Sequence, residues 1–441
     1  YLPAPSIGEH NDEIRSMNFS FNSVAKKSNP LNLPLKGIRV VDMTQVWSGP
    51  YGARFLADMG AEVIKIEGPK FPDPVRTGIS GGALPTINLS PYYNEYNRGK
   101  KSFTVDFKKP EGHEALLKLL KTADVFLENW SSGVAERNGI GYEEVKKINP
   151  SIVYLSMPGF GHVGPDSSRI GYGPTIEQMG GIVAIQGYEN GPPHKSGISY
   201  GDPIAGSTCA SAIICGLINR KKTGSGTYIV IPQRDGVTGL IAEYVISDYL
   251  DQPMDTRVGF KHPTSIPHNI YATIPDEVGR PIYSYDGQLL EKIDERWVAL
   301  ECRNDTEWEK LKKIVEISDF NHPDLNSYQG RKRNIQLIDK KLADWCSERR
   351  AEEISELLQS NEIPSSPVFS PLLLLNDPHI QDRELFVEVF HKLKKHHRTT
   401  RPTWRMERRT ELPQNSGPCF GQHNEEVLKN LGYSDEQIAN M

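Results

Sequence analysis

The chain has 441 residues, of which 24% are charged, and its formal net charge is −5. This length predicts two or three domains, and the nearly balanced charge argues against a nucleic-acid or acidic-membrane partner. Five scattered cysteines, with no CxxC pair and no zinc-like spacing to histidine, predict no metal site and favour a reducing, cytoplasmic compartment. There is no run of 18 apolar residues and no signal-peptide pattern.

The first feature along the chain is a phrase that occurs twice. "PSIGEHNDEI" at residues 5–14 matches "PCFGQHNEEV" at 418–427 in five of ten positions, and three further pairs are chemically similar. The polar stretch 15–36, which contains "KKSNPLNLPL", is typical of a linker. Because the sequence begins with Tyr1 rather than Met, we expect a piece of a longer chain.

Residues 37–254 alternate between strand-like and helix-like patterns. Strands are predicted at 38–43, 61–67, 102–107, 124–129, 151–157 and 227–232, and helices at 51–60, 112–123, 142–149 and 201–222. This alternation predicts the first part of a large α/β domain with a mostly parallel sheet.

The pattern changes after residue 255, where proline and histidine recur. A strand at 296–304 and charged helices at 305–316, 334–350 and 351–360 predict a smaller α+β domain over 255–385. A strand-like run at 386–393 then suggests that 386–441 return to the large domain.

Two turns are candidates for chemistry. "WSGPYG" follows the first strand without a GxGxxG fingerprint or a Walker lysine, and it is either a plain turn or a ligand-binding one. Asp202 in "GISYGDPIAG" opens an alanine- and glycine-rich helix. Aspartate at such a position is often a helix cap, but a carboxylate with little bulk around it can also act as a nucleophile.

Longer blocks carry a resemblance to a known family. "LKGIRVVDMTQVWSGPYGARFLADMGAEVIKIEGP", "NRGKKSFTVDFKKPEG", "ADVFLENWSSGVAERNGIGYEEVKKINPSIVYLSMPGFG" and "GISYGDPIAG" resemble the family III CoA-transferases in order and spacing. The resemblance covers about residues 35–440 and includes formyl-CoA and carnitine CoA-transferases, with α-methylacyl-CoA racemases as relatives. It implies a large α/β domain, with a mostly parallel Rossmann-like sheet, that is built from both chain ends. It also implies an inserted smaller domain and an interlocked dimer. It also implies acyl-CoA and a small carboxylate as substrates.

The resemblance suggests an origin for the repeated phrase. Because a similar phrase lies near the C-terminus of family members, residues 1–14 are interpreted as the tail of a preceding copy. A tandem pair of this kind resembles the bacterial dimethylsulfoniopropionate CoA-transferase/lyase, which loads a sulfonium zwitterion onto CoA and releases dimethyl sulfide. An ordinary transferase for carnitine-like or dicarboxylic acids and a catalytically silent copy remain alternatives.

The family pattern assigns roles to particular residues. Its nucleophile falls on Asp202. Its CoA-binding positions fall on Trp47, Ser48, Val105 to Lys108, Asn129, Trp130, Ser131 and Arg137, with Tyr172 and Gly173 facing the nucleophile. The chain departs from formyl-CoA transferase in having Trp47 for Gln, Gly68 for Arg (with Lys70 nearby) and Gly173 for Glu, and in lacking the glycine-rich lid. Tyr172 stands where the racemases have histidine, which argues against racemisation.

Aromatic residues suggest the kind of acceptor. Trp47 and Tyr172 lie in segments that the family places around the reacting thioester, and Tyr92, Tyr93 and Tyr96 follow in "SPYYNEYNRG". Ring faces attract a sulfonium or trimethylammonium group, although these rings could simply pack together. For elimination after transfer, Tyr172 and Glu177 are the candidate bases.

Overall fold

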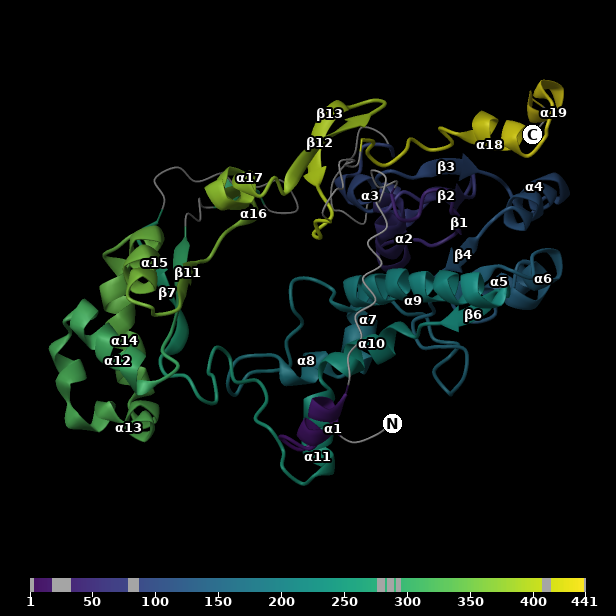
Figure 1. Cartoon of the computed structure of the whole chain (residues 1–441). Helices are drawn as coiled ribbons and strands as arrows, with labels where there is room; N and C mark the ends of the chain where they lie inside the picture. Colours follow the sequence, from purple (N-terminus) through teal and green to yellow (C-terminus); the bar gives the residue numbers. More distant parts are fainter. Residues whose placement is uncertain are drawn as a thin grey trace.

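The computed structural model describes residues 4–17, 33–77, 87–275, 282–283, 289–290, 295–406 and 414–439 (Figure 1). Most of the expected linker at 15–36, and residues 1–3 of the expected tail, lie outside the described residues.

A six-stranded parallel sheet forms the large domain. Its strands are β1 (Arg39–Asp42), β2 (Glu62–Glu67), β3 (Lys101–Thr104), β4 (Val125–Glu128), β5 (Val153–Ser156) and β6 (Thr227–Val230). Their order, β3-β2-β1-β4-β5-β6, is that of a doubly wound dinucleotide-binding sheet. The central strands are rich in valine, isoleucine and leucine because both of their faces are buried.

The helices of the large domain lie on both faces of this sheet. They are α2 (Ser48–Asp58), α3 (Pro91–Tyr96), α4 (Pro110–Lys121), α5 (Val134–Arg137), α6 (Tyr142–Ile148), α7 (Gly173–Met179), α8 (Ile182–Ile185), α9 (Gly201–Thr223), α10 (Gln233–Leu240) and α11 (Ala242–Tyr249). One core joins α2 and α9 to the sheet, and a second joins α4, α6 and α18 (Asn424–Asn430) to the other face. The α/β class predicted from the sequence is therefore confirmed.

Helix α9 is the only helix in the described part of the chain that is long and apolar enough to span a membrane. Half of its most apolar window is buried within the fold. Cys209, Ala210 and Ile213 pack in the core with α2 and the central strands, as expected of a core helix.

The C-terminal end does not contribute a strand to the large sheet. All six strands lie within residues 39–230. The C-terminal end, which the sequence led us to expect in this domain, joins it instead through Val427 and Leu428, which pack in its core. The predicted return strand is β12 (Phe386–His391), which pairs with β13 (Lys395–Thr400) in a hairpin of its own. Edge strand β3 is instead covered by loop 421–424 and by α18, followed by α19 (Asp435–Ala439).

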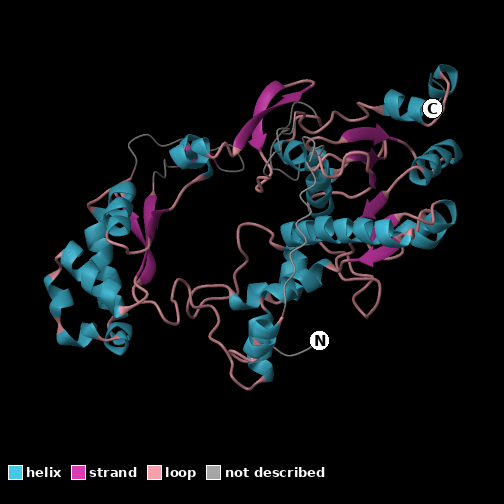
Figure 2. Cartoon of the chain, in the orientation of Figure 1, coloured by secondary structure: helices cyan, strands magenta, loops and turns pink. Residues whose placement is uncertain are grey.

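The smaller domain has its own sheet and core. An antiparallel sheet, β11-β10-β7, is made of β7 (His268–Thr273), β10 (Arg296–Glu301) and β11 (Ser365–Pro367). Its helices are α12 (Asp305–Val315), α13 (Tyr328–Arg333), α14 (Ile335–Ser347) and α15 (Ala351–Ser360); α16 (Pro371–Asn376) and α17 (Pro378–Asp382) lead back. A short pair, β8 (Ile282–Tyr283) and β9 (Leu289–Leu290), and three 3-10 turns complete the fold: Pro74–Arg76, Ser318–Asn321 and Pro323–Asn326. Figure 2 shows this domain well separated from the large sheet.

Candidate active site

The N-termini of α2 and α9 meet at the carboxyl edge of the large sheet. Two glycines allow the two helices to approach closely. Gly52 lies four residues after Ser48 in α2, and Gly206 lies four residues after Asp202 in α9. A Cβ at Gly206 would lie 2.6 Å from the Ser48 carbonyl oxygen, and one at Gly52 would lie 2.7 Å from the Gly206 carbonyl oxygen. The backbone of Ser48 therefore comes close enough to hydrogen bond to the Asp202 carboxylate.

Asp202 is a buried carboxylate in the first turn of α9. Tyr200 occupies the N-cap position, so Asp202 is not the cap of this helix. Burial raises the pKa of Asp202 to about 6, with the hydrogen bond from Ser48 acting in the opposite direction. Glu177 also raises this pKa and Lys195 lowers it. Most of the carboxylate is thus ionised at neutral pH, but it is poorly solvated.

Helix α7 forms the opposite side of this carboxylate. A Cβ at Gly173 would lie 2.3 Å from Asp202 Oδ2, so the two residues are in direct contact. Tyr172, at the N-cap of α7, is 56% exposed. One turn into α7, Glu177 is only 1% exposed; its carboxylate accepts a hydrogen bond from the Tyr200 N–H and lies 3.6 Å from Lys195 Nζ.

Three aromatic rings pack together beside Asp202. The rings of Trp47 and Tyr96 stack with centroids 5.3 Å apart, and the Tyr92 ring lies 5.8 Å from Trp47 and 4.8 Å from Tyr96. Burial raises the pKa of both tyrosines, and the charge of Asp202 contributes to each shift, which places the cluster within electrostatic reach of the carboxylate. Within the described part of the chain, the indole Nε1 of Trp47 is buried without a hydrogen-bond partner.

Tyr93 does not join this cluster. Tyr92 and Tyr96 share one face of α3 because they are four residues apart, whereas Tyr93 points into the interior. Its hydroxyl donates to Glu67 Oε2 at 3.2 Å, and the Arg76 guanidinium lies 3.5 Å from its ring centroid. For Tyr93 the packing alternative is therefore correct.

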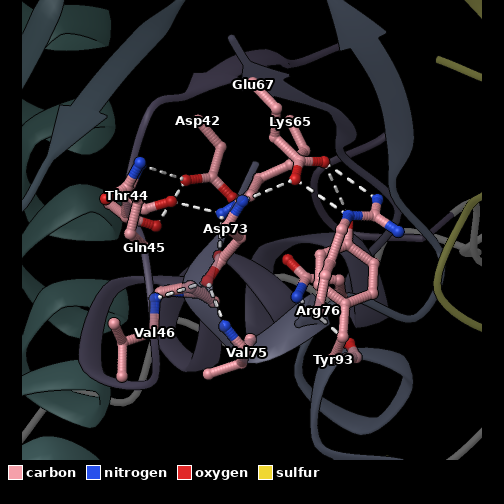
Figure 3. Close-up of polar contacts among 12 residues, drawn as sticks. Asp42, Thr44, Gln45, Val46, Lys65, Glu67, Asp73, Val75, Arg76 and Tyr93 are labelled. Atoms are coloured by element: carbon pink, nitrogen blue, oxygen red, sulfur yellow. Dashed lines mark hydrogen bonds and ion pairs between the residues drawn. The ribbon is translucent and has the colours of Figure 1, made fainter. Parts of the chain in front are cut away.

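A buried ionic network supports the loop that carries Trp47 (Figure 3). Lys65 pairs with Asp73 at 2.8 Å, and Asp73 Oδ1 accepts a hydrogen bond from the Val46 N–H at 3.1 Å. Lys65 Nζ also donates to the Thr44 carbonyl oxygen. Val46 has a φ of 67°, a conformation that is costly for a β-branched residue and persists only when its surroundings hold it. The network therefore holds the turn in place.

Sequence reasoning missed this network and the role of Lys195. One signal was present: Lys65 and Glu67 are charged positions in the otherwise apolar stretch "VIKIE" at residues 63–67. Buried charges are tolerated when they are paired, so charges in a central strand indicate partners elsewhere in the chain. Glu67 finds its partner in Arg76, at 2.8 Å.

The predicted CoA positions lie just after the carboxyl ends of β1, β3 and β4. Asn129 holds the turn after β1, since its side chain bonds the Gln45 N–H at 2.8 Å and the Ser48 hydroxyl at 3.3 Å. Trp130 stacks on Phe107 with centroids 6.2 Å apart, which joins the segments after β4 and β3.

The remaining candidates differ in their surroundings. The side chain of Val105 is buried in the core and is not available to a ligand. Lys108 and Arg137 are exposed, and within the described part of the chain neither forms an ion pair. Ser131 is partly buried and accepts a backbone hydrogen bond from Val134 at the start of α5. Among the described residues, no group of three His, Cys, Asp or Glu side chains could hold a metal ion.

Comparisons with known proteins agree with this architecture. The chain is 31% identical to a succinyl-CoA:mesaconate CoA-transferase of Haloarcula hispanica, over 80% of this chain and 85% of that protein. It is 29% identical to a formyl-CoA:oxalate CoA-transferase of Rhodopseudomonas palustris, over 92% of this chain and 95% of that protein. A CAIB/BAIF family protein from Brucella suis matches its structure with a TM-score of 0.79 and 27% identity, covering 91% of this chain and all of that one. Residues 35–279 and 288–424 match CoA-transferase family III, and the chain belongs to this family.

Proposed function

We propose that this enzyme transfers CoA from an acyl-CoA donor to a small carboxylic acid through a covalent intermediate on Asp202. The observation that carries the proposal is the placement of this carboxylate: it is buried at the N-terminus of α9, bonded by the Ser48 backbone and touched by Gly173. Poor solvation favours nucleophilic attack, and the absence of a side chain at residue 173 lets helix α7 pack against the carboxylate without displacing it.

The steps balance without a metal ion or a net proton. An Asp202 oxygen attacks the thioester carbonyl, the C–S bond breaks, and a mixed anhydride and a CoA thiolate result. The thiolate attacks the aspartyl carbonyl, which releases the donor acid and leaves an aspartyl-CoA thioester. An acceptor carboxylate then repeats both steps in reverse and regenerates Asp202. Retention of the thiolate in the site keeps each second attack effectively intramolecular.

Two helix N-termini support these steps. Negative charge develops on the carbonyl oxygen in each tetrahedral intermediate, and backbone N–H groups at a helix N-terminus stabilise such charge. Helix α9 extends for 23 residues and α2 for 11, and both begin at this carboxylate. We assign CoA to the carboxyl edge of the sheet, between Ser48, Asn129 and the Phe107–Trp130 stack, with Lys108 and Arg137 available for its phosphates.

Substitution of the nucleophile tests the proposal. Asp202→Asn removes the charge with little change in volume, and we expect it to abolish transfer while CoA binding and thermal unfolding change little. Mass spectrometry of the wild-type chain incubated with acyl-CoA should reveal a CoA adduct on Asp202, which hydroxylamine converts into a hydroxamate. Asp344→Asn, on the exposed face of α14 in the smaller domain, is the matched control. Full activity of Asp202→Asn would rule out the covalent mechanism.

For the acceptor we propose a small acid with a permanent cation, such as dimethylsulfoniopropionate. The cluster of Trp47, Tyr92 and Tyr96 offers ring faces near Asp202, and a cation–π contact contributes about 0.5–2 kcal/mol. The buried indole N–H of Trp47, which has no partner among the described residues, is a donor for the acceptor carboxylate. Because a sulfonium cannot donate a hydrogen bond, ring faces suit it better than polar groups do.

Once the sulfonium acid is a CoA thioester, its α-proton is acidified and elimination becomes possible. A base removes this proton, the β C–S bond breaks, and dimethyl sulfide leaves with the electron pair, so that acryloyl-CoA remains. Glu177 suits the role of base better than Tyr172, because its carboxylate is buried close to Asp202 whereas Tyr172 is largely exposed.

A dicarboxylic acceptor is the second candidate. It is favoured by the relatives, whose names include succinyl-CoA:mesaconate and formyl-CoA:oxalate CoA-transferases. Lys195, 3.6 Å from Glu177, would be the cation that receives the second carboxylate. A catalytically silent copy is disfavoured, because Asp202 and its polar partners are all in place.

Trp47→Leu distinguishes the two acceptors. For a sulfonium or trimethylammonium acid, loss of the ring should raise KM by about 2- to 30-fold, the equivalent of the cation–π energy. KM for a neutral acid of the same shape should change much less. Dimethyl sulfide release is measured in parallel by gas chromatography, with acetyl-CoA and succinyl-CoA as donors. Equal losses for both acids, with no dimethyl sulfide, would favour the dicarboxylate.

We also propose that two copies of the domain pair, either as a homodimer or with a preceding tandem copy. Helix α11 buries none of its residues and exposes Val245, Ile246 and Tyr249, with Leu250 beyond its end. An apolar surface of this kind is typical of an interface.

A further inference from the structure

The C-terminal copy of the repeated phrase is bonded to the edge of the large sheet. Strand β3 pairs with β2 on one side only, so its other edge requires a cover. His423 Nδ1 accepts the Ser102 N–H at 3.0 Å, and the His423 N–H donates to the Ser102 carbonyl oxygen at 3.0 Å. Asn424 likewise bonds both the N–H and the carbonyl oxygen of Thr104, at 2.8 and 3.3 Å.

Three further contacts complete this arrangement. The Gly421 N–H donates to the Ser102 hydroxyl at 3.0 Å, and Glu426 pairs with Lys101 at 2.7 Å. Val427 is buried in the core beneath the sheet. We call residues 418–427 the edge clamp, because they satisfy the exposed backbone of β3 without adding a strand.

The N-terminal copy retains the residues that make these contacts. Gly8, His10, Asn11 and Glu13 are identical to their counterparts in the edge clamp, and Ile14 replaces Val427. The differences are confined to conservative changes and to three positions that make none of the β3 contacts: 6, 7 and 9.

The N-terminal copy also adopts the same backbone conformation. Gly8 and Gly421 both have positive φ, 83° and 68°, and the N-cap residues His10 and His423 have (φ, ψ) of (−105°, 11°) and (−117°, 18°). The two turns also have the same hydrogen bond. The Asn11 N–H donates to the Gly8 carbonyl oxygen at 3.1 Å, and the Asn424 N–H donates to the Gly421 carbonyl oxygen at 3.1 Å. Helix α1 (Asn11–Ser16) begins at Asn11, as α18 begins at Asn424.

Among the described residues, the N-terminal copy is not bonded to any strand. Helix α1 buries no residue, and Ile7 and Ile14 are exposed. Its counterpart surface on this domain, the edge of β3, is already occupied by residues 421–427.

We propose that residues 5–14 are a second edge clamp, which binds the β3 edge of another domain of this fold. The partner is a domain that carries Pro5–Ile14 as its own C-terminal phrase, so that the clamp of one domain and the start of the next lie on one chain. His10 acts as a neutral acceptor through Nδ1, Asn11 bonds both backbone groups of the strand, and Ile14 enters the core below it.

A transplant within the whole chain tests the chemistry of the phrase. Residues 418–427 are replaced by the sequence of residues 5–14, and the melting temperature is compared with that of the parent. We expect a loss of no more than about 4 °C, the equivalent of roughly 1 kcal/mol for a domain of this size. The same transplant with alanine at the positions of His423 and Asn424 should lose at least twice as much. Equal losses for the two transplants would overturn the proposal.

Peptide binding tests recognition directly. A fluorescent peptide of residues 4–17 is titrated into the His423→Ala/Asn424→Ala chain, whose own clamp is weakened. We expect it to bind at least tenfold more tightly than a matched peptide carrying His10→Ala and Asn11→Ala, and to protect the Ser102 and Thr104 amides from hydrogen exchange. The wild-type chain, with its edge occupied, should bind the peptide more weakly. Equal binding of both peptides, or protection elsewhere than β3, would overturn the proposal.

Discussion

The two sides of Asp202 are built in different ways. On one side, the turn after β1 is held by a buried network of ion pairs and by Asn129, which fix Val46 in a strained conformation and position Trp47 and Ser48. On the other side, α7 is a helix of seven residues that contacts Asp202 through Gly173 and leaves Tyr172 exposed.

The two sides of the site are held in place by different interactions. Buried charges that are fully paired specify one geometry, because any alternative would leave a charge unpaired in the interior. The turn after β1 is therefore the fixed side of the site, whereas the α7 side depends on a steric fit to the carboxylate. Substitutions in the ionic network should therefore lower the stability of the fold. Substitutions at the contact between α7 and Asp202 should lower the activity instead.

The largest expected effect is on the network side. Lys65→Met leaves Asp73 buried without its partner, and such a change typically costs about 3–5 kcal/mol in the free energy of unfolding. Tyr172→Ala, on the exposed side, should cost less than about 0.5 kcal/mol. Urea unfolding followed by circular dichroism measures both. A Lys65→Met chain as stable as the parent would show that the network does not hold the turn.

The next effect is on activity alone. Gly173→Ala places a methyl group against Asp202 Oδ2 and Ser199, so the carboxylate must move. Since displacement of a reacting group by about 1 Å can cost roughly 100-fold in rate, we expect a loss of that order in kcat. The melting temperature should stay close to that of the parent. Gly197→Ala, where a Cβ meets nothing within 4 Å, is the control; equal rates for the two variants would show that the contact has no catalytic importance.

The smallest effect is a shift of the pH profile. Because Asp202 must be ionised to attack, kcat/KM should fall about tenfold per pH unit below its pKa of about 6. Glu177 raises this pKa through its negative charge, so Glu177→Gln should move the acid limb to lower pH. A limb that stays in place, or moves to higher pH, would show that Glu177 does not act on the nucleophile by its charge.

Much of the fold was predictable from local patterns. Valine- and isoleucine-rich runs and amphipathic periods predicted the parallel sheet, the helices α2, α4, α6 and α9, and the helices α12, α14 and α15 of the smaller domain, because side-chain spacing reflects which face of an element is buried. The shorter helices, among them α7 beside Asp202, were not predicted. The run at 386–393 was also strand-like, but its partner could not be inferred. That partner is the next segment, β13, whose sequence KHHRTT has no apolar strand pattern, so the two form a local hairpin. Coverage of β3 by the side chains of His423 and Asn424, in contrast, depends on contacts between distant segments.

Residue order and short-range periodicity were enough to indicate the family, the parallel sheet and the position of Asp202 at the start of an alanine- and glycine-rich helix. Two features depend on the folded chain: Tyr96 joins Trp47 while Tyr93 turns inward, and Lys65 and Asp73 hold the turn beneath them. The same holds for the edge clamp proposed at residues 5–14, because only the contacts of His423 and Asn424 with β3 show what such a phrase can bind. The physical reason is that burial, charge pairing and edge coverage are properties of the packed chain, in which residues far apart in sequence become neighbours.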